Sequence, residues 1–293
     1  MIMSLIKGGT MKRQLFIIFA MCALFSRAGH TTLTLQQALD EALVKAQARA
    51  LGGYQDKCME MNIENLTKDS LIVIVEAGRR LNSLDDKDQD ILIIKQEIIT
   101  LGRQQNKWFV VTGYCCQNHN HSPKKMGKYD VNTLADSNLV ILARYLDGKQ
   151  FDHHAIQQAI WAISDKESTG KIASKTDTTL TPLRELVATL KGEPLPWFSI
   201  ASTTYEFSNG RMQNFAVWIR GKIEFNSTQD NYVTLHVLNS KGEQVGQIVK
   251  MWSGVGKKTY DLCMSVAGFP KGKYTVEIVN DDKIELVKKE FEI

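Results

Sequence analysis

The feature that most constrains the fold is a regular alternation of short apolar segments and polar turns in the C-terminal third of the chain. Strands are predicted at 217–225, 232–238, 245–251, 259–264, 274–279 and 284–291, after a first strand that begins at Thr203. Turns such as Asn239-Ser240-Lys241-Gly242 separate them. Because short strands at this spacing pair into two stacked antiparallel sheets, residues 203–293 are predicted to form an all-β, seven-stranded sandwich.

The preceding part of the chain mixes strand and helix periodicities. Strands are predicted at 59–63, 71–75, 91–94, 97–101 and 108–112, and helices at 34–51, 131–146, 153–164 and 183–190, with a polar loop at 166–179. This predicts an α+β domain over residues 29–192, an antiparallel β-sandwich with helices. Residues 193–202, which include Pro194 and Pro196, are predicted to link it to the second domain at 203–293.

The first 28 residues have the pattern of a signal peptide. Lys12 and Arg13 precede the apolar run 15–25, and Ser26-Arg27-Ala28 places small residues at a cleavage site. Export is therefore expected, to the periplasm, the cell surface or the medium. Cys22 leaves lipid attachment open as an alternative, although Met21 is unlike the small residue that usually precedes a lipidated cysteine. No later segment is long and apolar enough to predict a membrane span.

The net charge of +4 depends on that leader. Residues 1–28 hold four basic residues and no acid, so the remaining chain balances 32 basic against 32 acidic residues. A neutral chain lacks the basic surface that nucleic-acid binding requires, and no nucleic-acid partner is expected. The sequence also has no phosphate-binding loop, dinucleotide fingerprint or hydrolase nucleophile motif, so neither a cofactor nor an enzyme activity is expected.

Two short segments combine residues that could react with each other. Tyr114-Cys115-Cys116 ends the predicted strand at 108–112, and Pro123 follows it; Gln157-Gln158-Ala159-Ile160-Trp161 lies on the predicted helix at 153–164. This order resembles the thioester domain of bacterial surface adhesins, in which a cysteine after an aromatic residue pairs with the glutamine of a Gln-x-Ala-aliphatic-Trp motif. Cys115 and Gln157 match those two positions. Ile156 stands where the family usually has Thr, and Cys116 has no counterpart.

The resemblance implies that Cys115 and Gln157 form an internal thioester, which an amine on a target surface can open. Tyr114, Ala159, Ile160 and Trp161 would be supporting residues. On a helix, Gln157 and Trp161 share a face, so Trp161 could shield the bond from water. On a strand, Cys115 and Cys116 point to opposite faces, so only one can meet Gln157. The alternative is a domain of the same architecture in which Gln157 only satisfies buried backbone groups.

The cysteines allow two other interpretations. Export permits a disulfide, and Cys58 on an early strand could pair with Cys115 or Cys116, whereas Cys263 is expected to be a buried free thiol. A metal site would draw on Cys116 with His119 and His121, or on His153 and His154. Their spacing does not match zinc-binding patterns, so no metal site is predicted.

The sequence therefore predicts an exported envelope or surface protein that acts in adhesion, with covalent capture through the thioester as one alternative. The other is a non-covalent structural or ligand-binding envelope protein. The partner would be a host or envelope surface protein or polymer, bearing amines in the covalent case.

The stretch 269–276 resembles the penultimate hairpin of bacterial immunoglobulin-like domains, and more weakly a type IX secretion sorting domain, which implies a stalk or sorting role for the C-terminal region.

Overall fold

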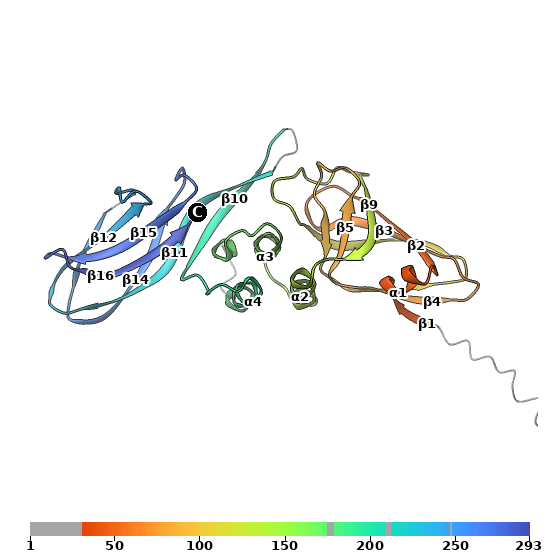
Figure 1. The fold of residues 1–293 in the computed structure, drawn as a ribbon, viewed down its shortest axis with the longest axis horizontal. Coiled ribbons are helices and arrows are strands. Elements are labelled where there is room, and N and C mark those ends of the chain that lie inside the picture. The colour runs from red at the N-terminus through yellow and green to blue at the C-terminus, as the bar shows by residue number, and fades with distance from the viewer. Residues whose placement is uncertain (1–30, 175–178, 209–211, 247) are drawn as a thin grey trace, which may run out of the picture.

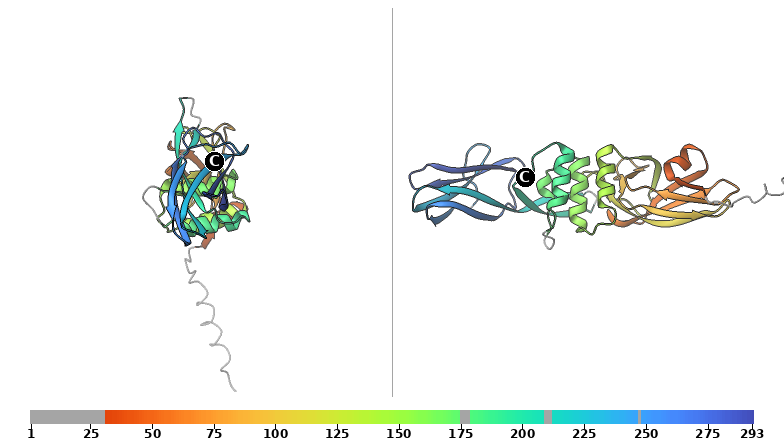
Figure 2. Two further views of the ribbon diagram at one scale, coloured as in Figure 1. Left: turned by 90° about the vertical axis from the view of Figure 1, so that its left-hand side faces the viewer. Right: turned by 90° about the horizontal axis from the view of Figure 1, so that it is seen from below.

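A computed structural model describes residues 31–174, 179–208, 212–246 and 248–293. The expected signal peptide at 1–28 and Cys22 lie outside these ranges. The molecule is mostly β, with several sheets, and three short helices within residues 137–191 form a layer between an N-terminal barrel and a C-terminal pair of sheets (Figures 1 and 2). No helix in the described ranges combines the length and apolar character needed to cross a membrane.

The N-terminal region contains a closed six-stranded barrel rather than the expected sandwich. Its strands, in spatial order, are β2 (Val44–Ala50), β3 (Gln55–Asn65), β8 (Asn106–Cys115), β6 (Ile91–Ile93), β5 (Arg79–Ser83) and β9 (Lys128–Leu134). A separate sheet contains β1 (Thr31–Thr34), β4 (Leu71–Val75) and β7 (Glu97–Leu101). Its inward side chains, such as Val73 and Leu101, share one core with the barrel. Closure leaves the barrel without the exposed edges of an open sheet.

The predicted helix at 34–51 is wrong beyond its first turns. Thr34 and Gln37 form a capping box that starts α1 (Leu35–Asp40), and Ala42 then adopts a left-handed conformation with φ of 54°. The chain continues as β2, which pairs along its length with β3. Alternate residues of β2 face the core, as they do in any strand with one buried face. The apolar residues in this pattern were interpreted above as one face of a helix.

The predicted helix at 131–146 is also corrected at its start. Residues up to Leu134 belong to β9, which pairs with β5 and β2. The helix α2 (Ser137–Leu146) begins only where Asp136 accepts hydrogen bonds from the amides of Asn138 and Leu139. A side chain that satisfies these free amides favours a helix start at this point.

The remaining helices lie close to their predicted positions. The helix α3 (His153–Ser164) begins after Asp152, as expected, and α4 (Thr181–Lys191) covers the predicted 183–190. The loop expected at 166–179 contains a buried 3-10 turn, η1 (Thr169–Lys171), and its residues 175–178 lie outside the description. The three helices enclose a second core that contains Leu142, Ile160 and Val187.

In the described part of the C-terminal region, seven strands form two sheets. One sheet orders β10 (Phe198–Glu206), β11 (Met212–Ser227) and β14 (Gly256–Ser265); the other orders β13 (Val249–Ser253), β12 (Asn231–Asn239), β15 (Lys273–Asn280) and β16 (Glu285–Glu292). Side chains from both sheets, including Ile219 and Ile278, share a third core. Strand β10 begins at Phe198, inside the segment expected to be a linker, because Phe198 and Ile200 are buried in that core.

Candidate functional site

The end of β8 and the middle of α3 meet at the boundary between barrel and helices. Asp152 accepts a hydrogen bond from the amide of Ala155 at 3.1 Å and sets the start of α3. Ile156 and Ile160 then anchor the helix in the core between the helices. Gln157 and Trp161, one turn apart, occupy the side of α3 that faces the barrel, and Trp161 belongs to the barrel core. This face brings Gln157 to Cys115.

Gln157 pairs with the backbone of Cys115. Its Oε1 accepts a hydrogen bond from the Cys115 amide at 3.2 Å, and its Nε2 donates to the Cys115 carbonyl at 2.7 Å. The same Cys115 amide also lies 3.2 Å from the carbonyl of Tyr54. Gln157 is 1% exposed and Cys115 is fully buried. The structure therefore brings together the two residues predicted to react, in a site closed to bulk water.

The adjacent cysteines point into different cores. Cys115 lies in the barrel core together with Trp161, whereas Cys116 lies in the core between the helices. Burial raises the pKa of the Cys116 thiol to about 12, although the nearby Arg80 lowers it in part. The Cys116 carbonyl accepts a hydrogen bond from Ser164 Oγ at 2.5 Å. Cys116 is thus a protonated, packed thiol on the opposite side of the strand from Cys115.

The predicted supporting residues are all buried. Ala159 and Ile160 pack between the helices, and Trp161 is 1% exposed. The indole N–H of Trp161 has no hydrogen-bond partner in the described part of the chain. Its ring lies in the barrel core that also contains Cys115.

Tyr114, the fourth supporting residue, contacts His153, which the sequence suggested only as a metal ligand. Its hydroxyl lies 2.6 Å from His153 Nδ1, and the two rings stack with centroids 6.2 Å apart. Burial raises the pKa of the Tyr114 phenol well above its usual range. His153 is exposed and precedes Gln157 by four residues, and this spacing is the signal that could have linked it to the site.

No disulfide joins cysteines in the described part of the chain, and Cys58, Cys115 and Cys116, considered as disulfide partners, are all buried there. Cys58 Sγ donates to the carbonyl of Gly113 at 3.3 Å, and burial raises its pKa to about 12. Cys263, expected to be buried, is exposed because it lies on the outward side of β14.

The histidines after Cys116 do not gather around a metal position. His119 Nδ1 lies 4.0 Å from Asp165, with 65% of its side chain exposed, whereas His121 pairs through its backbone with Lys87 and Gln89. Within the described residues, no group of three or more His, Cys, Asp or Glu side chains could hold a metal ion.

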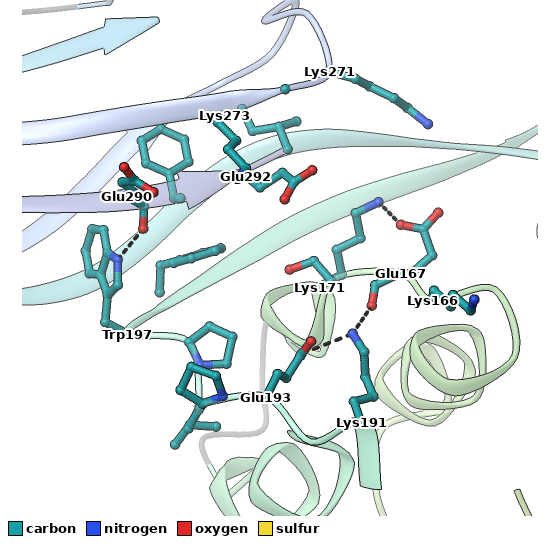
Figure 3. A pocket seen from close by; sticks show the side chains of 18 residues that line it. Lys166, Glu167, Lys171, Lys191, Glu193, Trp197, Lys271, Lys273, Glu290 and Glu292 are labelled. Carbon is teal, nitrogen blue, oxygen red and sulfur yellow. Dashed lines mark hydrogen bonds and ion pairs between the residues drawn. The ribbon is translucent and has the colours of Figure 1, made fainter. Parts of the chain in front are cut away.

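A separate cleft of about 1000 Å³ lies between the helical layer and the C-terminal sheets (Figure 3). Two ion pairs lie in its charged lining. Lys191 contacts Glu193 at 3.0 Å and the Glu167 carbonyl at 2.6 Å, and Lys171 pairs with Glu167. Trp197 donates its indole N–H to the Glu290 carbonyl at 2.7 Å. None of the predicted site residues lines this cleft.

No protein-family model matches the chain, and no curated protein matches its sequence. Among solved structures, it is similar to the β-glucosidase DesR from Streptomyces venezuelae in complex with D-glucose, at 8% identity and a TM-score of 0.16. The match covers 85% of this chain and 47% of that enzyme, so the chain spans about half the enzyme's length. A likeness this low carries no argument about fold or activity.

Proposed function

We propose that this protein is an exported adhesion module that captures amine-bearing targets covalently, through a thioester between Cys115 and Gln157. The observation that carries the proposal is the contact between the Gln157 carboxamide and Cys115, at 2.7 and 3.2 Å, inside a fully buried site. Residues 42 positions apart in the chain are brought together by a strand end and a helix.

Formation and opening of the thioester are balanced reactions that need no cofactor. The Cys115 sulphur attacks Gln157 Cδ, the C–N bond breaks, and the carboxamide nitrogen leaves as ammonia with the thiol proton. An incoming primary amine then attacks the same carbon, the C–S bond breaks, and an amide remains while Cys115 regains its proton. A carboxamide is a weak electrophile, so its reaction depends on the close placement that the two hydrogen bonds provide.

Burial supports this use of the site. Water would hydrolyse a thioester, and the barrel core that contains Cys115 and the buried Trp161 helps to exclude it. Cys116 lies in the core between the helices, and the Cys58 thiol donates to the carbonyl of Gly113. Of the three buried cysteines, Cys115 is the one whose backbone holds the carboxamide.

In this proposal the molecule has two parts with different tasks. Residues 29–192 form a thioester-domain-like unit that reacts with the target. Residues 203–293, extended at the start by β10, form an immunoglobulin-like stalk or sorting domain. The signal-like sequence at 1–28 supports delivery of both to the cell envelope or surface.

A non-covalent module of the same architecture is the second candidate. The observation that favours it is that the Gln157 oxygen and nitrogen are each already bonded to the backbone of Cys115. A buried glutamine with both groups satisfied is a sufficient structural clamp between α3 and β8.

Intact-mass measurement separates the two candidates. With a thioester, the purified protein should weigh less than its sequence mass by one ammonia, and methylamine should add its own mass by opening the bond. Cys115→Ala and Gln157→Ala should abolish both effects. Cys116→Ala and Gln158→Ala are the matched controls, each a buried neighbour of the same type, and should retain them.

An unmodified sequence mass would contradict the covalent proposal and leave the clamp. Alkylation of Cys115 in the native protein would point the same way. A mass lower by two hydrogens would instead reveal a disulfide among Cys58, Cys115 and Cys116.

A further inference from the structure

The strand β10 lies at the free end of its sheet. The order β10-β11-β14 gives β10 one neighbour, and no strand in the described ranges pairs with its other edge. At the start of that edge, Arg184 donates hydrogen bonds to the carbonyls of Pro196 and Phe198, at 2.9 and 2.5 Å. Residues 199–206 therefore form an edge that another strand could extend through backbone hydrogen bonds.

The other end strands of the C-terminal sheets are protected against such pairing, and β10 is not. β14 carries Lys257 and Lys258, β16 carries Lys288 and Lys289, and β13 is only five residues long. The end strands of the separate N-terminal sheet, β1 and β7, are also short, at four and five residues. β10 has nine residues, FSIASTTYE, without Lys or Pro, and its single charge is the last residue, Glu206. Because Lys, Pro and short length are what keep sheet edges apart, this composition favours pairing.

Exposed aromatic rings lie on the outer face of the same hairpin. Tyr205 of β10 is 57% exposed, and its ring meets that of Phe215 of β11 with centroids 5.7 Å apart. Trp218, also on β11, is 42% exposed. The inner face of the hairpin contacts the helices, where Asn214 donates to Gln158 of α3 at 3.1 Å. The hairpin extends past the helices (Figures 1 and 2), and exposed aromatic rings of this kind are typical of interaction surfaces.

We propose that β10 pairs antiparallel with β10 of a second copy of this chain, about a two-fold axis, so that the two β10-β11-β14 sheets become one. Two identical strands related in this way are self-complementary, and no like charges meet along residues 198–205. When the strands overlap fully, the end of each at Glu206 comes beside the start of the other, where Arg184 lies, so opposite charges approach. This inference does not depend on the thioester.

Sedimentation equilibrium over a concentration series tests the pairing. The purified protein should show a monomer–dimer equilibrium, measured with a reductant because the exposed Cys263 could cross-link two copies. Thr203→Lys, near the middle of the edge, should weaken the dimer at least about tenfold, because the two introduced ammonium groups lie close together across the two-fold axis. Thr259→Lys, the same change at an exposed position of β14 on the opposite edge of the sheet, should leave the equilibrium unchanged.

Hydrogen exchange identifies the paired edge without a substitution. Amides of residues 199–205 should exchange more slowly in the dimer than in the monomer, whereas those of β14 should exchange at the same rate in both. A monomer at every concentration would overturn the inference and leave this edge to a strand of another protein. A dimer that Thr203→Lys does not weaken, and that leaves exchange in β10 unchanged, would also overturn it, because a different surface would then join the copies.

Discussion

In the barrel and the adjoining helices, the buried side chains include Asn62, Arg79, Gln157 and Gln158, whereas Ser227, Ser253 and Asn280 are the buried polar residues described in the C-terminal sheet pair. The first region buries charge and long amides, and the second buries short polar groups at its strand ends. Each long buried polar group must be matched by a specific partner. Polar partners thus constrain the geometry of the first region, and apolar packing that of the second.

Arg79 shows how strongly the N-terminal region depends on such partners. Its guanidinium is fully buried, pairs with Glu76 at 3.0 Å, and donates to the Val131 carbonyl at 2.7 Å. It also lies 3.3 Å from the Gln36 side-chain oxygen. One side chain therefore ties α1, β5 and β9 together.

The largest expected effect is on this group. Arg79→Met keeps most of the volume but leaves Glu76 and the Val131 carbonyl without their partner, so the free energy of unfolding of the N-terminal region should fall by about 3–5 kcal/mol. Urea unfolding followed by tryptophan fluorescence and by limited proteolysis would measure it. A loss below 1 kcal/mol would show that the charge network does not hold the barrel.

The matching change in the sheet pair is Ile278→Ala. Ile278 is fully buried in the C-terminal core, and truncation leaves a cavity, so the free energy of unfolding of that region should fall by about 2–4 kcal/mol. Calorimetry on both variants sharpens the comparison: Arg79→Met should shift the transition of the barrel, and Ile278→Ala that of the sheet pair. A single transition that both changes shift equally would contradict independent regions.

A smaller effect is expected at the start of α3. Asp152→Ala removes the cap on the Ala155 amide and should cost about 1 kcal/mol of unfolding free energy. The cap also sets where α3 begins and thus where Gln157 lies, so the fraction of protein that shows the ammonia loss should fall. Asp152→Asn, which keeps an oxygen acceptor, is the control and should retain most of both properties.

The smallest effect concerns pH. Burial raises the pKa of Asp165, and the Asn118 amide that donates to it at 2.5 Å opposes this only in part. The folded state then binds the Asp165 proton more tightly than the unfolded state, so this residue's contribution to stability falls as pH rises from about 4 through the raised pKa. Urea titrations across pH 3–7 should show this slope, and Asp165→Asn should remove it. An unchanged slope in the variant would assign it to other carboxyl groups.

The strand pattern was predicted best where a short segment rich in apolar and β-branched residues ends at a clear turn. The segments 71–75 and 97–101 match β4 and β7, and the six later segments each correspond to one strand of the sheet pair. Within the segment 34–51, residues 44–50 were predicted wrongly, because Ala and Leu at mixed spacing fit a helix as well as a strand. Pairing of β2 with β3 decided in favour of the strand.

The same limit applies to the candidate site. The sequence alone identified the motif around Gln157 and its separation from Cys115 along the chain. It also predicted that Cys115 and Cys116 point to opposite faces of the strand. The pairing of the carboxamide with the Cys115 backbone and the contact of Tyr114 with His153 were not predicted. Both depend on how α3 lies across the end of β8.

The sequence by itself determined the elements whose signals are local: the start of α3 at its Asp152 cap, the alternation of the C-terminal strands, and the residues that α3 presents on each face. Closure of the barrel, the strand conformation of residues 44–50, and the contacts of Gln157 with Cys115 and of His153 with Tyr114 were decided only by the tertiary structure. A cap or a period acts over a few residues of backbone, whereas these contacts join segments about 40 or more positions apart and exist only when the shared cores are packed.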